Sequence, residues 1–276
     1  MPKILTEHQV RQFNEEGFIS PIDVMSEAAA KALKARLEEV EALYPQELNS
    51  KNRNNAHLAF KFMDEIAHNS IILDAVEDLL GKNISLWGSV LFIKEPQSAG
   101  YVSWHQDATY MGLEPHDFVT PWLALTNSNP ENGCMSMIPG SHRNNIHYHE
   151  DTFDNDNILT RGQAVQNIDE SMAVDLILKP GQMSIHHAKV IHGSKPNLSN
   201  QRRIGAVLQS FTRTSALQIL GENYWIPIRG SEINERHNHL PRPVSDMTET
   251  AQATREKANR NWSEILYQDA ESKRAY

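Results

Sequence analysis

The stretch ISLWGSVLFI at residues 84–93 decides the fold that the sequence predicts. β-Branched and aromatic residues dominate it, and Pro96 and Gly100 mark a turn behind it. Further short runs of the same kind follow, separated by turn-forming residues such as Asn129-Pro130. These strand candidates are Val102–Asp107, Val119–Thr126, Cys134–Ile138, Ala173–Leu178, Gln182–His186 and Arg203–Thr212. Many short, punctuated strands predict a mostly β fold, either a sandwich or a barrel.

Helical patterns flank this β region on both sides. Thr6 and Gln9 form a capping-box pattern before a helix predicted over Glu7–Glu16, which Gly17 would end. Further helices are predicted after Ser26, over Ile71–Leu80 and around Ile265 in the tail.

We expect a single domain made of three parts. They are a helical N-terminal part at about residues 1–82, a β core at about 83–215 and a C-terminal extension at about 216–276. Residues 144–170 within the β core are polar and poorly periodic. A long insertion of this kind in a compact domain is often a functional lid.

The composition excludes several classes of protein. Hydrophobic residues make up 39% of the 276 residues, which is enough for a packed core. The formal net charge is -9, and no run of Lys or Arg suggests a nucleic-acid partner. Cys134 is the only cysteine, which excludes an internal disulfide and fits a reducing compartment. No stretch resembles a signal peptide or reaches the roughly 20 apolar residues that span a bilayer. We expect a soluble, cytoplasmic protein of undetermined oligomeric state that does not bind membranes.

His105 and Asp107 lie two residues apart in the stretch WHQDATY at 104–110. On a β-strand, this spacing points both side chains to the same face. An imidazole and a carboxylate side by side are two of the three ligands in the two-His, one-carboxylate arrangement, which binds iron(II) and leaves coordination positions open. The candidates for a third ligand are His186, His187 and His192. His-x-Asp is a common tripeptide, so the spacing alone does not establish a metal site.

Arg202 and Arg203 follow these histidines. A strand that begins at Arg203 would carry Arg203, Gly205, Val207 and Gln209 on one face by period-two alternation. A buried guanidinium needs an anion, and a carboxylate is its natural bidentate partner. The alternative is that both arginines lie in water at the entrance of a strand.

Five short motifs, in this order and spacing, resemble those of the phytanoyl-CoA dioxygenase family. They are His105-Gln106-Asp107, Asn132-Gly133-Cys134, Ile138-Pro139-Gly140-Ser141-His142, His192-Gly193-Ser194 and Arg203. The resemblance covers about residues 5–215. It implies a double-stranded β-helix core of the jelly-roll or cupin type. It also implies an oxygenase that depends on Fe(II) and 2-oxoglutarate and uses dioxygen.

The same resemblance assigns the iron ligands. It implies that His105, Asp107 and His192 hold the metal, and it implies no catalytic residue beyond them. Related halogenases carry a small residue in place of the carboxylate, so that chloride can bind there. The presence of Asp107 therefore favours hydroxylation, in which 2-oxoglutarate is converted to succinate and carbon dioxide.

The resemblance also assigns four residues to the co-substrate. Arg203 and Ser194 would bind the distal carboxylate of 2-oxoglutarate, and Trp122 would line its pocket. Lys61 corresponds loosely to an upstream basic residue that approaches the co-substrate. Core packing for Trp122 and a solvated charge for Lys61 are the alternative interpretations.

The substrate is less constrained by the sequence. Tyr101, Trp104, Tyr110 and Trp87 lie near the metal loop, where they could form a cage for an ammonium group or pack in the core. Basic residues such as Lys94 could instead bind an anionic head group. No basic groove for a CoA nucleotide is evident, which favours a small polar metabolite. Examples are an aminophosphonate such as 2-aminoethylphosphonate, or an ectoine-like or amino-acid-like compound.

Two alternatives to this interpretation stay open. The first is an oxygenase that acts on an acyl-CoA or on a natural-product intermediate. The second belongs to another class of protein, a β-helix protein that binds a metal or a small ligand without turnover.

Overall fold

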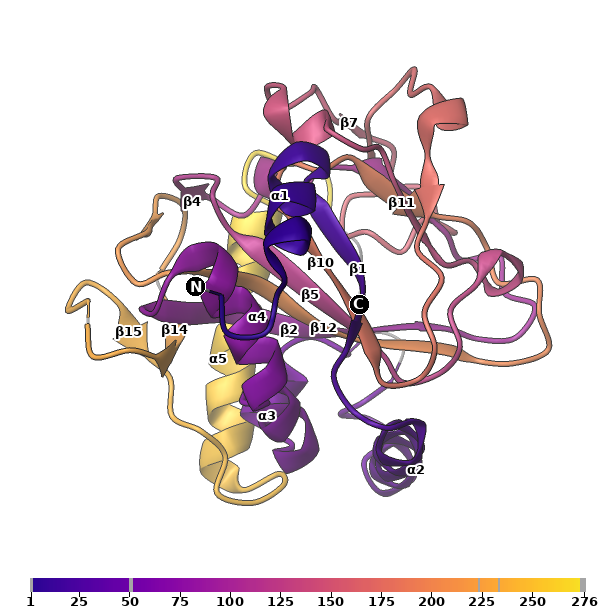
Figure 1. The fold of residues 1–276 in the computed structure, drawn as a ribbon. Coiled ribbons are helices and arrows are strands. Elements are labelled where there is room, and N and C mark those ends of the chain that lie inside the picture. The colour runs from indigo at the N-terminus through magenta and orange to yellow at the C-terminus, as the bar shows by residue number, and fades with distance from the viewer. Residues whose placement is uncertain (1, 50–51, 223, 233, 274–276) are drawn as a thin grey trace.

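The computed structural model describes residues 2–49, 52–222, 224–232 and 234–273, and two β-sheets form its centre (Figure 1). The larger sheet has the strand order β1 (Phe18–Asp23), β10 (Gln182–His187), β5 (Val119–Ala124), β12 (Arg203–Arg213), β2 (Ile84–Lys94), β14 (Tyr224–Arg229) and β15 (Asn238–His239). The smaller sheet has the order β3 (Val102–His105), β11 (His192–Ser194), β6 (Met135–Met137) and β9 (Val174–Asp175). Within these two sheets neighbouring strands are antiparallel, except that β14 and β15 are parallel.

Short elements complete the β region. Two small antiparallel pairs are β4 (Leu113–Glu114) with β13 (Leu217–Gln218), and β7 (Glu150–Asp151) with β8 (Gln163–Ala164). The 3-10 turns are η1 (Ala56–Leu58), η2 (Asp107–Thr109), η3 (Pro130–Asn132), η4 (Ser141–Arg143) and η5 (Glu170–Met172). The prediction of a mostly β fold with a jelly-roll core and flanking helices is confirmed.

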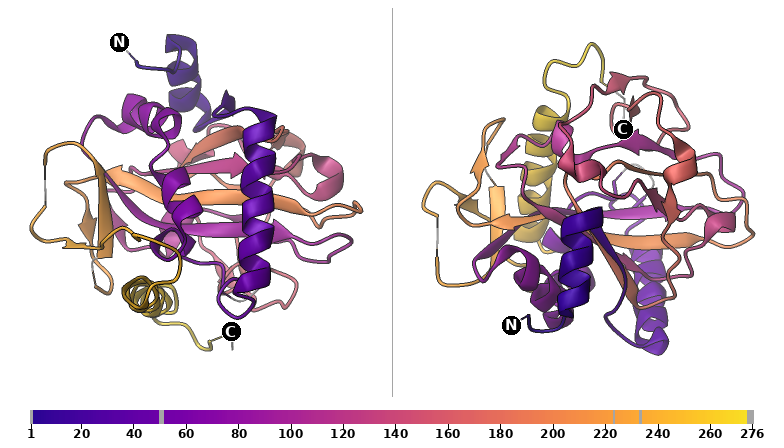
Figure 2. Two further views of the ribbon diagram at one scale, coloured as in Figure 1. Left: turned by 90° about the horizontal axis from the view of Figure 1, so that it is seen from below. Right: turned by 45° about the horizontal axis from the view of Figure 1, so that its top comes forward.

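The α-helices of the described residues flank the sheets. They are α1 (Glu7–Glu16), α2 (Glu27–Leu43), α3 (Lys61–Ala67), α4 (Ser70–Leu80) and α5 (Glu249–Leu266). Helix α1 has the predicted bounds: Thr6 and Gln9 form both bonds of a capping box, and Gly17 ends the helix with φ +87°. Figure 2 shows α2 running across the strands of the larger sheet.

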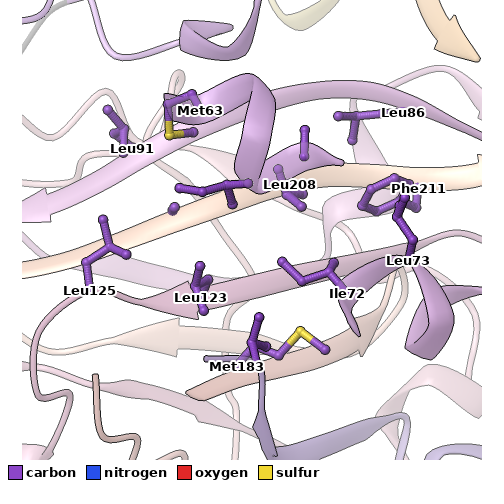
Figure 3. Packing of buried hydrophobic residues seen from close by; sticks show 14 of the residues in the cluster. Met63, Ile72, Leu73, Leu86, Leu91, Leu123, Leu125, Met183, Leu208 and Phe211 are labelled. Atoms are coloured by element: carbon purple, nitrogen blue, oxygen red, sulfur yellow. The ribbon is translucent and has the colours of Figure 1, made fainter. Parts of the chain in front are cut away.

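The main core lies between helices α1 to α4 and one face of the larger sheet. Met63 of α3 and Ile72 of α4 project into it from the helices (Figure 3). Leu91, Leu123 and Leu208 project into it from β2, β5 and β12. Burial of each such side chain contributes about 1.5–3 kcal/mol, so this layer fixes the strands that carry the candidate site.

The opposite face of the larger sheet looks toward the smaller sheet. Trp122 and Val207 are the sequence neighbours of core residues in β5 and β12, so strand alternation sends their side chains to this second face. They pack there with Met135 of β6 and with Val190, just before β11. The candidate site lies in this space between the two sheets.

Several elements were not predicted or differ in extent. Strand β1 and strand β14 contain Pro21 and Pro227, and a proline within a run weakens the strand signal. Helix α3 has seven residues and no side-chain hydrogen bond at its N-cap. The predicted strand over 173–178 is only the two-residue β9, and the predicted strand over 102–107 ends at His105. Among the described residues, no helix has the length and apolar character to cross a membrane.

Candidate metal centre

His105, Asp107 and His192 come together between the sheets. His105 ends β3, and His192 begins β11 directly opposite it, because the two strands pair antiparallel at this position. Asp107 begins the turn η2 just after β3. One donor atom from each residue lies within 4.8 Å of those of the other two. The Nε2 atoms of His105 and His192 are 3.5 Å and 3.7 Å from Asp107 Oδ1.

Backbone carbonyl groups orient both imidazole rings. His105 Nδ1 donates to the carbonyl oxygen of Ser103, and His192 Nδ1 donates to that of Val190, each at 2.9 Å. A proton on Nδ1 leaves the Nε2 lone pair of a neutral ring to bind a metal. Burial, followed by the nearby charge of His105, holds the pKa of His192 well below its usual range.

The two oxygens of Asp107 have different surroundings. Oδ1 faces the two imidazoles, whereas Oδ2 accepts hydrogen bonds from three side chains. Those donors are Thr120 Oγ1 at 3.1 Å, His186 Nε2 at 3.3 Å and Gln209 Nε2 at 3.2 Å. Burial raises the pKa of Asp107, but its contacts with His105 and His186 outweigh this and hold that pKa well below the usual range. The carboxylate is therefore ionised, and Oδ1 is the oxygen left for a metal.

Two imidazole nitrogens and one carboxylate oxygen fit a divalent metal such as Fe(II). The arrangement is that of the two-His, one-carboxylate sites, which occupy one face of the metal and leave open positions for other ligands. His186, another candidate for the third ligand, lies behind Asp107 and donates a hydrogen bond to Oδ2.

Arg203 forms a second polar subsite in the same space. Its guanidinium lies over the Trp122 ring, 4.8 Å from the centroid, and the side chain is buried. Gly205 makes this stacking possible, because a Cβ atom there would lie 2.0 Å from Trp122 Cζ2. Arg203 Nε and Nη1 are buried without a hydrogen-bond partner, and burial lowers the Arg203 pKa to about 10. An unpaired guanidinium in the core fits a carboxylate ligand.

Both subsites open into one cavity of about 220 Å³. Most of the residues proposed from the sequence line it: His105, Asp107, His192, Arg203, Ser194, Trp122, Trp87 and Tyr110. Val207 and Gln209 also line it, as the alternation along β12 predicts.

Three residues proposed from the sequence do not line this cavity. Lys61 begins α3, where its Nζ lies 3.6 Å from Asp64 and its side chain is 38% exposed. The upstream basic residue that does line the cavity is Arg53. Tyr101 donates a hydrogen bond to Asp154, and Trp104 Nε1 donates to Glu170, so both side chains bind the 144–170 segment. The structure thus brings two of the four proposed aromatic cage residues to the cavity, not all four.

Other cavity residues were missed by sequence reasoning. They come from three distant parts of the chain: Arg53 and Asn54, Ile158–Thr160 with Gln163, and Trp262 with Leu266. Trp262 of α5 stacks on Trp87, with ring centroids 4.3 Å apart. No local pattern signals these contacts, because they arise when α5 and the 144–170 segment pack on the sheets.

Comparisons with known proteins show which family the chain resembles. A family model described as "Phytanoyl-CoA dioxygenase (PhyH)" matches residues 13–205. The chain is 29% identical over 192 residues to a "Probable alpha-ketoglutarate-dependent hypophosphite dioxygenase" of Stutzerimonas stutzeri, covering 69% of this chain and 66% of that protein. It is 32% identical over 115 residues to a phytanoyl-CoA dioxygenase of Arabidopsis thaliana, covering 42% and 40%. The chain thus spans less than two thirds of the length of these curated relatives.

A solved structure resembles almost the whole chain. It is described as "non-heme monooxygenase; ThoJ apo", with a TM-score of 0.83 and 28% sequence identity. The match covers 94% of this chain and 98% of that one. The similarity therefore extends over nearly the full length of both chains.

Proposed function

The chain belongs to the phytanoyl-CoA dioxygenase family, and on that premise we propose that it is an Fe(II)- and 2-oxoglutarate-dependent dioxygenase that hydroxylates an unactivated C–H bond of a small molecule. One observation carries the proposal. His105, Asp107 and His192 converge beside the unpaired guanidinium of Arg203 in a single cavity.

Each group has a defined role in this proposal. His105, Asp107 and His192 hold Fe(II), and Arg203 with Ser194 binds the distal carboxylate of 2-oxoglutarate. When bound, Fe(II) with 2-oxoglutarate and dioxygen supplies an oxidant that converts R–H to R–OH, while 2-oxoglutarate becomes succinate and carbon dioxide.

In this proposal, the protein holds the metal-binding carboxylate in position and encloses the co-substrate. Thr120, His186 and Gln209 fix Asp107 Oδ2, so that the carboxylate keeps one oxygen toward the metal. With Asp107 as a ligand, its coordination position is not open to chloride, which supports hydroxylation over halogenation. The wall made by Trp122 and Val207 shields the co-substrate from water.

Succinate formation from 2-oxoglutarate with added Fe(II) tests the proposal. We expect His105→Ala and Asp107→Ala each to reduce it by at least about a hundredfold, because each removes one of three metal ligands. His8→Ala, which changes an exposed histidine of α1, is the control and should match the wild type. Unchanged turnover in both site variants would show that the metal lies elsewhere.

For the substrate, we propose a small polar metabolite, with an aminophosphonate such as 2-aminoethylphosphonate as one candidate. The relative described as a hypophosphite dioxygenase supports a phosphorus compound. Arg53 lines the cavity and can contribute positive charge, although Glu95 pairs with it at 3.2 Å. Ectoine-like and amino-acid-like compounds belong to the same size class.

The stacked pair of Trp87 and Trp262 favours a second candidate, a natural-product intermediate with an apolar or planar group. Leu266 and Ile158 extend this apolar wall. Oxygen consumption in the presence of 2-oxoglutarate separates the candidates, because a true substrate couples oxygen uptake to succinate formation. A protein that binds metal or ligand without turnover would form no succinate with any compound.

A further inference from the structure

Arg203 and Ser194 form the proposed anion subsite, and Lys94 is a buried lysine beside it. The roles assigned above do not use Lys94. It ends β2 and lies directly opposite Arg203 in the pairing of β2 with β12, and it is 2% exposed. Its Nζ lies 2.7 Å from Ser194 Oγ, and it also donates to the carbonyl oxygen of Lys195. Ser194 lines the cavity, so Lys94 contacts the anion subsite from behind.

The charges around Lys94 create a demand for an anion. Among the described residues, no carboxylate forms an ion pair with Lys94 or Arg203. The groups that act on the Lys94 charge are Arg203 and the Cys134 thiol. Glu95, the next residue, pairs with Arg202 instead. Two basic side chains therefore lie side by side in the core without an acidic partner, which is costly unless an anion binds.

Lys94 can affect the anion through the hydroxyl group of Ser194, because that group can either donate or accept a hydrogen bond. A charged ammonium group has only donors, so it uses a lone pair of Ser194 Oγ and leaves the Ser194 O–H to donate elsewhere. A neutral amine can instead accept from the Ser194 O–H, which turns that hydrogen toward Lys94 and away from the cavity. The protonation of Lys94 thus decides where the Ser194 hydroxyl points.

We propose that Lys94 is a positioning residue of the anion subsite. Its charged form directs the Ser194 hydroxyl to the distal carboxylate of 2-oxoglutarate and adds a second positive charge behind Arg203. This inference rests on the proposed function, because it takes 2-oxoglutarate as the anion.

The arrangement couples binding to a proton. Burial and the Arg203 charge lower the pKa of Lys94 to about 6, so the amine is mostly neutral at neutral pH without an anion. A carboxylate at Arg203 raises that pKa, because an opposite charge favours the ammonium form. Binding then takes up a proton, and the affinity falls up to about tenfold per pH unit above about 6, until the raised pKa is reached. Arg203 and Cys134, with pKa values of about 10 and about 11, keep their protons in this range.

Isothermal titration calorimetry measures the affinity for 2-oxoglutarate and the number of protons taken up on binding, and it needs no turnover. 2-Oxoglutarate is titrated into the full chain with Fe(II), without oxygen, near pH 7.5, in two buffers of different ionisation enthalpy. We expect the wild type to take up about one proton. We expect Lys94→Met to take up almost none and to bind roughly 10- to 100-fold more weakly, because a charge-assisted hydrogen bond is lost. Lys31→Met removes one exposed lysine of α2 and should match the wild type.

The outcomes separate this inference from the proposed function. If the wild type binds 2-oxoglutarate without proton uptake, or if Lys94→Met binds as tightly as the wild type, the role of Lys94 is overturned and the proposed function stands. If the wild type does not bind 2-oxoglutarate, both are overturned. The proton count of the wild type needs no variant, so it remains decisive even if Lys94→Met does not fold.

A double-mutant cycle tests whether Lys94 acts through Ser194. We expect the combined Lys94→Met and Ser194→Ala variant to lose less affinity than the product of the two single losses, because both changes disrupt one contact. Independent, multiplicative losses would contradict the positioning role.

Discussion

Arg202 and Arg203 are consecutive residues in opposite environments. Arg202 donates to both carboxylate oxygens of Glu41, each at 2.9 Å, and these hydrogen bonds raise the Arg202 pKa. Arg203, the first residue of β12, lines the cavity, and two of its nitrogens have no hydrogen-bond partner. The sequence did not decide whether these arginines are buried or lie in water. Consecutive residues of a strand point to opposite faces, which explains why only Arg203 faces the cavity.

This pair provides a matched test of the anion subsite. We expect Arg203→Ala to weaken 2-oxoglutarate binding by roughly 2–5 kcal/mol, because it removes the partner of a buried carboxylate. Arg202→Ala removes ion pairs that lie outside the cavity, so it should leave the co-substrate requirement unchanged. The measurement is the dependence of succinate formation on 2-oxoglutarate concentration. The reverse order of effects would move the subsite to Arg202.

At the scale of elements, the 144–170 segment and α5 close the cavity together. Arg161 joins them: its Nη1 lies 3.1 Å from Asp151, and its other nitrogens donate to carbonyl oxygens at the C-terminal end of α5, including that of Leu266. The Arg161 guanidinium also lies over the Tyr110 ring, 4.5 Å from its centroid. Tyr110 in turn donates to Asp151 at 3.0 Å. Arg161 thus connects the 144–170 segment both to α5 and to Tyr110, which follows the proposed metal ligand Asp107 in the chain.

We expect Arg161→Met to loosen this closure. Loss of the carbonyl and carboxylate contacts should speed proteolytic cleavage within 144–170, because opening of the segment then costs less free energy. The affinity for 2-oxoglutarate should stay near that of the wild type, since its subsite lies on β12 and β11. Limited proteolysis followed by mass spectrometry reads the first effect, with Arg143→Met, an exposed arginine, as the control. An unchanged cleavage pattern would show that Arg161 does not hold the segment.

In the whole molecule, residues near 53 and the C-terminal helix α5 meet beside the cavity. Arg255 of α5 is buried and donates to the carbonyl oxygens of Glu47, Asn52 and Asn54. This contact positions the loop that presents Arg53 to the cavity. Because the helix, the loop and the sheets each contribute to one cavity, we propose that the chain forms a single oxygenase domain.

The same contacts explain what the sequence could and could not predict. The bounds of α1 follow from a local capping box, and the shared face of Arg203, Val207 and Gln209 follows from strand alternation. Local chemistry of this kind can be read without knowledge of the fold. Arg53 escaped prediction because its neighbours are held by Arg255, about 200 residues further along the chain. Trp262 escaped prediction because it stacks on Trp87, which lies far from it in the sequence. Lys61 was proposed from a loose alignment, which could not tell which basic residue before the β core faces the cavity.

We propose that one cavity holds Fe(II) and 2-oxoglutarate together. Absorption spectroscopy without oxygen tests it most directly, because a 2-oxo acid bound to Fe(II) gives a visible charge-transfer band that neither component gives alone. We predict that the band appears in the wild type only when both are added, and that His192→Ala abolishes it. A wild type without the band, or a His192→Ala variant that keeps it in full, would show that Fe(II) and 2-oxoglutarate do not bind together at this site.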